Sequence, residues 1–416
     1  MKVRAGYKQT EVGIIPDEWD VKTIDQVAFV TSGKRLPLGS SLVDVPTPHP
    51  YIRVTDMRPG TVDTSEIMYV PESAFPAIKR YRIYQADIFI SVAGSLGIVG
   101  KIPAELHGAN LTENADRITD ITCSQDYLLY VLLSPLIQNA IDSFRTVGAQ
   151  PKLALTRIRK FAVPIPPTDA EQRAIATALS DVDALLGGLD RLIAKKRDLK
   201  QAAMQQLLTG HTRLPGFHGE WEVKRLGDCL LSRPDYGVNA AAVPFSDRLP
   251  SYIRITDISE HGRFSPSPRV SVKASSADQY YLHEGDVVFA RTGASVGKSY
   301  LYDSCDGPLV FAGFLIRVRP NPDLLVSAFL AAYTTTKPYW NWVRLMSMRS
   351  GQPGINGNEY AQLLLSLPPL PEQSAIAAVL SDMDAEIAAL EQRLDKTRAL
   401  KHGMMQELLT GRTRLV

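Results

Sequence analysis

Residues Ala290–Tyr300 read ARTGASVGKSY, and the Gly-Lys-Ser at their centre is the pattern with which nucleotide-binding loops hold phosphate groups. Such a loop needs four residues between its first glycine and the Gly-Lys, because that length lets successive backbone N–H groups curl around the phosphates. Here three residues separate Gly293 from Gly297, and Thr292 stands where the glycine is required. The next stretch, SYLYDSCDGP, alternates like a strand, whereas the anion site needs a helix N-terminus. The pattern favours a glycine turn over a nucleotide site.

The first half of the chain contains a similar turn. Ala86–Ile102 reads ADIFISVAGSLGIVGKI, with Gly94 and Gly100 too far apart for a closely matching loop and Ile102 in place of a magnesium-binding hydroxyl. We interpret both stretches as strand-ending turns at equivalent places in two copies of one scaffold, with glycines that allow positive φ angles.

Other stretches also return, in the same order, about 200 residues later. EWDVK, YIRVTDM and ADIFIS are followed by EWEVK, YIRITDI and GDVVFA. The closest echo is between Glu171–Leu214 and Glu372–Leu415, which align without a gap, are identical at more than half of their positions, and end in LLTGHTRL and LLTGRTRL. The chain is therefore two copies of one unit, each with a variable region followed by a closely repeated segment.

The two parts of each copy have different periodicities. The variable regions mix short alternating stretches, Gly, Pro and Asp turns and one helical stretch each, which predicts mixed α and β domains. The repeated segments predict long helices, with Thr168 at capping-box spacing before Glu171, Pro371 beside the second start, and Gly210 and Gly411 at the ends. Their apolar residues recur at spacings of three and four and form a coiled-coil seam: Leu179, Val182, Leu186, Leu189, Ile193, Leu380, Met383, Ile387, Leu390 and Leu394.

A helix of this length needs a partner for its apolar stripe. Antiparallel pairing of the two helices would place one variable domain at each end of the pair. The alternative is that each helix packs on its own domain. We favour the pair, because a helix length shared by both copies suits a spacer better than a core element.

Composition sets further bounds. The chain has 416 residues, 45% apolar side chains and a net charge of +2. It contains no apolar run of membrane-spanning length, and its N-terminus MKVRAGYKQT lacks the apolar core of a signal peptide, so we expect a cytoplasmic protein. The three cysteines lie far apart and are expected to be reduced packing residues, and we expect no metal site. No large segment is strongly basic, so any nucleic-acid surface must be local.

Together, the opening GYKQTEVGIIPDEWDV, two turn-rich domains and two helices ending in LLTG-x-TRL resemble the specificity subunit of Type I restriction-modification enzymes. The resemblance covers nearly the whole chain and implies an α+β fold. It implies target-recognition domains over residues 1–167 and 211–369 and antiparallel coiled-coil spacer helices over 168–210 and 370–412. Each domain would read one half of a split double-stranded DNA site.

The same resemblance implies that this chain is not an enzyme. Two methyltransferase (modification) subunits would dock on the helices, restriction/translocase subunits would complete the complex, and S-adenosylmethionine, ATP and Mg²⁺ would bind to these partners. The residues agree with a non-catalytic chain, because no amino-methyltransferase or nuclease motif is found; Asn321-Pro322-Asp323-Leu324 lacks the second proline and the aromatic residue.

Base edges are read chiefly by Arg, Lys, Asn, Gln, Ser and Thr, while phosphate contacts fix position. The candidates for DNA contact are residues of these types beside loops and glycines: Lys34, Arg35, Lys79, Arg80, Arg82, Lys101, Arg145, Gln150, Lys152, Arg291, Lys298, Arg344, Arg349, Gln352, Asn356 and Asn358. Tyr339, Trp340 and Trp342 could stack on a flipped base, but we interpret them as packing residues.

Two alternatives stay open from the sequence. A nucleotide-hydrolysing enzyme with a divergent P-loop would lose ATP binding on Lys298→Ala. A purely structural coiled-coil scaffold would bind no DNA selectively, even with its partners present.

Overall fold

The computed structural model describes residues 4–144, 152–274, 277–348 and 352–415. The chain divides into two units, one formed by Met1–Leu189 with Arg393–Val416 and the other by Asp190–Gln392. Both divisions fall inside long helices. Each unit therefore contains one variable region, the first part of one long helix and the last part of the other.

The first unit contains two four-stranded sheets. One is antiparallel, in the order β11-β10-β13-β4, with bounds Val99–Lys101, Ile88–Ser91, Ala115–Thr119 and Phe29–Ser32. The other has the order β8-β5-β12-β9, with bounds Met68–Tyr69, Pro50–Ile52, Ala109–Leu111 and Arg82–Ile83, and its β5–β12 pair is parallel. All four residues of β10 are buried, because its two faces contribute to two cores, Ile88 and Ile90 to one and Phe89 to the other.

Short elements connect and cover these sheets. The strand pairs are β1–β2 (Tyr7–Thr10, Gly13–Pro16), β3–β14 (Asp20–Thr23, Ala162–Ile165) and β6–β7 (Met57–Arg58, Thr61–Val62). The helices are α1 (Ile24–Val27), α2 (Phe75–Ile78), α3 (Gln125–Leu133), α4 (Pro135–Asp142) and α5 (Leu155–Ile158). Six of the nine residues of α3 are buried, so this apolar helix is a core element.

The second unit repeats this plan. Its sheets have the orders β16-β23-β20-β21 (Asp235–Tyr236, Leu315–Val318, Val287–Ala290, Ser299–Leu301) and β17-β19-β18-β22 (Ala242–Pro244, Val270–Val272, Ser251–Ile253, Leu309–Phe311). The β18–β22 pair is parallel, as β5–β12 is in the first unit. The remaining elements are β15–β24 (Glu222–Arg225, Leu364–Leu367), α7 (Ser327–Tyr333), α8 (Lys337–Met346) and α9 (Gly357–Ala361). The predicted pair of mixed α and β domains is confirmed.

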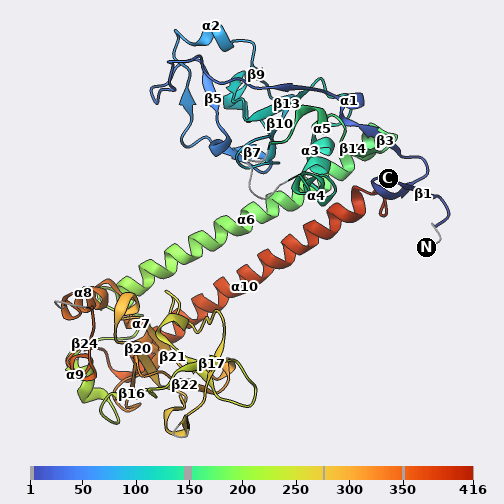
Figure 1. Cartoon of the computed structure of the whole chain (residues 1–416). Coiled ribbons are helices and arrows are strands. Elements are labelled where there is room, and N and C mark those ends of the chain that lie inside the picture. The colour runs from blue at the N-terminus through green and yellow to red at the C-terminus, as the bar shows by residue number, and fades with distance from the viewer. Residues whose placement is uncertain (1–3, 145–151, 275–276, 349–351, 416) are drawn as a thin grey trace. The chain divides into compact units, whose positions relative to one another are not determined.

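A long helix follows each variable region in the chain: α6 (Asp169–Leu207) follows the first and α10 (Leu370–Leu408) the second. Figure 1 shows each as one unbroken helix. Their stop signals act as expected, and one half of the predicted capping box is present, whereas the Glu171 carboxylate that would form the other half binds Arg414. The Thr168 hydroxyl accepts a hydrogen bond from the Glu171 N–H at 3.2 Å, and Gly210 and Gly411 have φ angles of 71° and 66°. All ten predicted stripe residues are buried or half-buried. The stripe is therefore the packed side of each helix.

Ion pairs give the direction of the two helices within each unit. In the second unit Lys196 pairs with Glu386 at 2.7 Å, and Lys200 with Asp384 at 2.6 Å. Residue numbers rise along α6 as those of the partners fall along α10, so the helices are antiparallel in the second unit. In the first unit Lys401 pairs with Asp183 at 2.6 Å, and Arg414, after the end of α10, pairs with Glu171 at the start of α6. The helices are therefore antiparallel in the first unit as well.

The glycine turn between β20 and β21 has no phosphate-loop geometry. Gly293 and Gly297 have φ angles of 71° and 89°, as Gly94 and Gly97 of the first unit have 76° and 79°. A strand follows the loop, where a phosphate site would need a helix. The predicted strand-ending turn is confirmed.

The two turns occupy equivalent places, as we interpreted them, but their two lysines do not. Lys101 pairs with Ile88 in the sheet, and the residue in that position of the second unit is Leu301, opposite Val287. The turns differ in length, so a shared Gly-Lys dipeptide concealed a shift in register.

Candidate DNA interface

A group of basic side chains surrounds Tyr81 in the first unit. The Lys34 ammonium lies 5.8 Å from the centre of the Tyr81 ring, and the Arg80 guanidinium carbon lies 5.5 Å from it. The backbone holds these segments together: Lys34 N–H donates to the Leu111 carbonyl at 2.8 Å, and Leu111 N–H donates to the Tyr81 carbonyl at 3.1 Å. Loops that are distant in sequence thereby present two cations on one aromatic ring, a favourable arrangement for the ring quadrupole.

Beside Tyr81 lies an open hollow of about 290 Å³. Arg80, Arg82 and Arg117 line it, together with residues from the end of β4. Arg82 donates from Nε to the Gly108 carbonyl at 2.9 Å, and its guanidinium carbon lies 5.7 Å from the Tyr84 ring centre. Three guanidinium groups around one hollow make it a suitable site for an anion such as a DNA phosphate.

The other candidates of the first unit differ in their surroundings. Arg35 pairs with Glu113 at 3.2 Å, and Lys101 pairs with Asp126. Lys79 and Lys152 are exposed. Within the described part of the chain, Lys34, Lys79 and Arg80 have no carboxylate partner. These three are free to bind an external anion. Arg145 and Gln150 lie outside the described residues.

The second unit does not repeat this basic group. A Cβ on Gly33 would clash with the carbonyls of Leu111 and Thr112, and one on Gly237 would clash with those of Phe311 and Ala312. The Tyr51 and Tyr252 hydroxyls donate to the carbonyls of Lys34 and Val238, each at 3.0 Å. Arg117 and Arg317 bind the carbonyls of Arg82 and Tyr281 in the same way. These equivalent contacts match the positions of the two units. The residues that take the places of Lys34, Arg35, Lys79, Arg80 and Arg82 are Val238, Asn239, Asp278, Gln279 and Tyr281. Five cations are thus replaced by uncharged residues and one carboxylate.

The candidates of the second unit lie elsewhere. Arg291 stacks over Tyr236, with its guanidinium carbon 5.0 Å from the ring centre. Gln352 lies beside Gly293, where its amide nitrogen is 3.2 Å from the position that a Cβ would take. The β20–β21 turn pairs with the segment before α9 through the Thr292–Gly354 bridge, which brings Gln352 beside Gly293.

The remaining candidates of this unit are scattered. Asn356 caps α9 by accepting from the Glu359 N–H at 3.0 Å, while Asn358 and Arg344 are exposed. Lys298 pairs with Glu260 at 2.7 Å. Arg349 lies outside the described residues. Asn356 is thus engaged in the structure of its own helix.

The repeated YIRVTD and YIRITD stretches build an internal clasp that we did not foresee. Arg53 and Arg254 each fold back on the aspartate three residues later, Asp56 or Asp257, through both guanidinium and backbone N–H donors. The pKa of Arg53 is raised, chiefly by its hydrogen bonds to Asp56. The identical Arg-x-x-Asp spacing in both copies was the available signal. These arginines stabilise the scaffold.

A second shared feature is an ion pair between the aspartate that precedes β10 or β20 and an arginine of the neighbouring strand. Arg117 approaches Asp87 at 3.8 Å, and Arg317 approaches Asp286 at 3.5 Å. Burial raises the pKa of the Asp286 carboxyl, and the nearby arginines oppose that rise.

The ends of the long helices carry a third set of shared contacts. In the first unit Arg414 reaches Glu171 at the start of α6 and also Glu18, and its guanidinium carbon lies 5.9 Å from the Trp19 ring centre. In the second unit Arg213 holds Glu372 at the start of α10 and lies 5.7 Å from the centre of the Trp221 ring. Glu171 and Glu372 are buried. The end of each long helical segment is therefore fastened to the start of the other copy's helix.

A glutamine beside each of these glutamates ties the helix to its own domain. Gln172 accepts from the Ser124 N–H at 2.8 Å, and Gln373 accepts from the Val326 N–H at 2.9 Å. Ser124 and Val326 are the residues that precede α3 and α7. In both units, therefore, the glutamate binds the arginine beyond the end of the other long helix, and the glutamine binds the helix's own domain.

The aromatic residues of α8 are packing residues, as we interpreted them. Tyr339 is fully buried, and its hydroxyl donates to the Gly297 carbonyl at 2.6 Å. Trp340 and Trp342 are half-buried and have ring centres 5.7 Å and 6.1 Å from that of Tyr339.

The duplicated architecture coincides with a known protein family. The Type I restriction modification DNA specificity domain matches twice, over residues 16–194 and 219–397. The chain belongs to this family. Each match contains one variable region and most of the long helix that follows it.

Relatives and solved structures cover nearly the whole chain. It is 23% identical to the EcoKI specificity subunit of Escherichia coli K12, over 95% of this chain and 89% of the relative. A crystal structure of the S subunit of a Type I restriction-modification system from M. genitalium has a TM-score of 0.57 at 14% identity, covering 98% of each chain. A chain from a structure of complex assembly in a type I R-M system reaches 0.60 at 18% identity, over 95% of this chain and 99% of that one. These similarities support the fold.

Among the described residues, no helix is long and apolar enough to cross a membrane. In the same part of the chain, no three His, Cys, Asp or Glu side chains gather in a way that could hold a metal ion.

We predict that Glu372→Gln lowers the thermal stability of the second unit. The substitution keeps the size of a fully buried side chain but removes the charge that Arg213 binds, and a broken buried pair is strongly destabilising. Glu222→Gln is the matched control, because Glu222 pairs with Lys224 at the surface. Differential scanning calorimetry should show a lower transition temperature for Glu372→Gln only. Equal shifts in the two variants would contradict the structural role of the helix-end pair.

Proposed function

We propose that this chain is the DNA sequence-recognition subunit of a Type I restriction-modification system, in which each variable domain reads one half of an asymmetric bipartite site. The observation that carries the proposal is the contrast between the two units. Both are held by the same Arg-Asp clasp, glutamine tie and helix-end ion pair. Equivalent loop positions, by contrast, carry different side chains, such as Arg80 and Gln279. A shared scaffold with divergent loops suits two readers of different sequences.

The long helices would set the spacing between the half-sites and dock the modification subunits. Each has 39 residues, which is about 58 Å of helix at 1.5 Å per residue. Several leucines of α6 face solvent although the stripe is packed, and Leu185, Leu192 and Leu199 recur every seven residues. Exposed apolar side chains at helical spacing suit a surface that a partner covers.

Catalysis would belong to the partners. Two modification subunits would supply S-adenosylmethionine and the methyl transfer, and restriction/translocase subunits would supply ATP and Mg²⁺. The phosphate-loop alternative has little support, because Lys298 is paired with Glu260 beside a strand-ending turn. A pure scaffold would not account for family membership in a DNA specificity domain that matches twice.

The first test exchanges one variable domain. Replacing residues 1–167 by the corresponding domain of another family member should change one half of the methylated site and leave the other half unaltered, because the sheets of the first unit are formed entirely by residues of that region. Methylome sequencing of cells that carry the complete operon measures both halves at once.

Exchange of residues 211–369 is the reciprocal control and should change the other half only. A change in both halves after a single exchange, or no methylated bipartite site with the native chain, would refute this division of labour.

A second test measures salt dependence. Lys34→Gln, Lys79→Gln and Arg80→Gln together should weaken binding of the assembled methyltransferase to target and unrelated duplexes alike. The slope of log K against log salt should become shallower by about 0.9 for each DNA phosphate that the variant no longer neutralises. Fluorescence anisotropy at several salt concentrations provides the slope.

The matched control adds charge at the equivalent place in the second unit. Asp278→Lys with Gln279→Arg should steepen the same slope. An unchanged slope in the Lys34/Lys79/Arg80 variant, with target binding intact, would remove the Tyr81 group from the DNA interface.

A further inference from the structure

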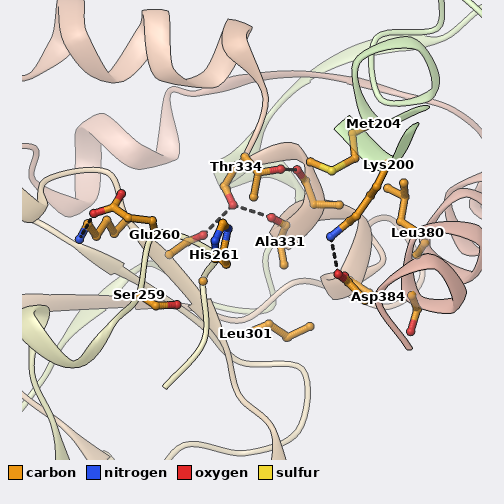
Figure 2. A pocket seen from close by; sticks show the side chains of 18 of the residues that line it. Lys200, Met204, Ser259, Glu260, His261, Leu301, Ala331, Thr334, Leu380 and Asp384 are labelled. Atoms are coloured by element: carbon orange, nitrogen blue, oxygen red, sulfur yellow. Dashed lines mark hydrogen bonds and ion pairs between the residues drawn. The ribbon is translucent and has the colours of Figure 1, made fainter. Parts of the chain in front are cut away.

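A hollow of about 260 Å³ lies in the second unit where α7 and the long helices meet. Its walls include Ala328, Ala331 and Ala332 of α7, Met204 of α6 and Leu380 of α10. Figure 2 shows the Lys200–Asp384 ion pair on one side of the hollow and His261 with Glu260 on the other. One wall of the hollow is therefore apolar, and the ion pairs Lys200–Asp384 and Lys298–Glu260 lie at its other sides.

The equivalent space in the first unit is filled by the chain itself. The Tyr130 hydroxyl donates to Asp183 Oδ2 at 2.9 Å. Lys401 pairs with Asp183 Oδ1 at 2.6 Å, and its ammonium lies 5.7 Å from the centre of the Tyr130 ring. The aspartate therefore binds a lysine with one oxygen and a phenol with the other.

The correspondence between the two places is fixed by hydrogen bonds. Gln172 and Gln373 hold the residues that precede α3 and α7, so positions along these helices can be matched from Ser124 and Val326. Tyr130 is six residues after Ser124, and Ala332 is six after Val326. The repeated helical segments likewise match Asp183 with Asp384, and Lys401 with Lys200. The second unit keeps the ion pair and lacks the ring.

One oxygen of Asp384 is left available by the absence of this ring. Lys200 pairs with Oδ1 at 2.6 Å, and Arg263 approaches the same oxygen at 3.9 Å. Within the described part of the chain, Oδ2 of Asp384 has no hydrogen-bond donor, whereas the matching oxygen of Asp183 binds Tyr130. The Asp384 carboxylate lies beside the hollow. A neutral hydroxyl group could donate a charge-assisted hydrogen bond to Oδ2 of Asp384.

We propose that this hollow binds a phenol group, with its hydroxyl donating to Asp384 Oδ2 and its ring against Ala332 and Leu380. The alanines of α7, Met204 and Leu380 offer an aromatic ring one apolar wall, and the Lys200 ammonium would lie near the ring as Lys401 does near Tyr130. The phenol is either a tyrosine side chain of a modification subunit or a free phenolic molecule. The first source rests on the proposed function, whereas the binding chemistry does not.

The test uses the full-length protein and p-cresol, which is the side-chain analogue of tyrosine. Ligand-observed NMR titration should detect saturable binding of p-cresol, with toluene at least about tenfold weaker because it lacks the hydroxyl that a charge-assisted hydrogen bond requires. Ala332→Tyr should abolish p-cresol binding by filling the hollow from inside, as Tyr130 does in the first unit. Tyr130→Ala is the matched variant and should create a second p-cresol site beside Asp183.

Two results would overturn the assignment: no saturable p-cresol binding by the native protein, or binding that survives Ala332→Tyr in a folded variant. Assembly with the modification subunits then separates the sources. Weaker assembly of Ala332→Tyr, together with competition by p-cresol, assigns the phenol to a partner tyrosine. Unchanged assembly of a variant that no longer binds p-cresol assigns it to a free molecule. Failure of the proposed function is read separately, from the absence of a methylated bipartite site.

Discussion

Neither long helix can bury its apolar stripe alone, and within each unit the start of one helix packs beside the end of the other. This requirement organises the chain. The core of the first unit includes Leu179 from the start of α6 and Leu408 from the end of α10, and the core of the second includes Leu380 and Leu207 in the corresponding places. Each unit is therefore completed by a segment from the other copy of the repeat.

The helix-end ion pairs give this arrangement its specificity. Arg414 and Arg213 each carry a charge to a buried glutamate that would be costly to leave alone. Both adjacent glycines have positive φ angles, and Gly411 is also confined sterically, because a Cβ there would come within 2.6 Å of Pro16, whereas one on Gly210 would lie at an ordinary contact distance of 3.5 Å from the Trp221 ring. The repeated LLTG-x-TRL sequence is thus explained by a glycine that ends the helix and an arginine that binds the buried glutamate at the start of the other helix. It serves the scaffold, which leaves the loops free to differ.

Local features of the fold were the most predictable. The capping residue Thr168, the terminal glycines and the helical stripes depend on residues close in sequence, and all act as expected. The partners of Arg213 and Arg53 could not be foreseen in the same way. The first lies across the fold, and the second required recognising a short-range arginine-aspartate clasp where a DNA contact was equally compatible.

The candidate site was only partly predictable. Sequence proximity grouped Lys79, Arg80 and Arg82, but only the fold brings Lys34 onto the same tyrosine. Lys101 and Lys298 shared a dipeptide and differ in register, because loops of unequal length shift side chains relative to the strands. Individual base contacts depend on the DNA sequence read, which leaves no fixed pattern in the protein.

Hydrogen exchange of an Arg414→Ala variant, followed by mass spectrometry, tests most directly whether each unit is completed by the other copy. We expect reduced protection in β2 (Gly13–Pro16) and at the start of α6, both far from the substitution in sequence, with the second unit unchanged. Reduced protection confined to the last residues of the chain would contradict this dependence of one copy on the other.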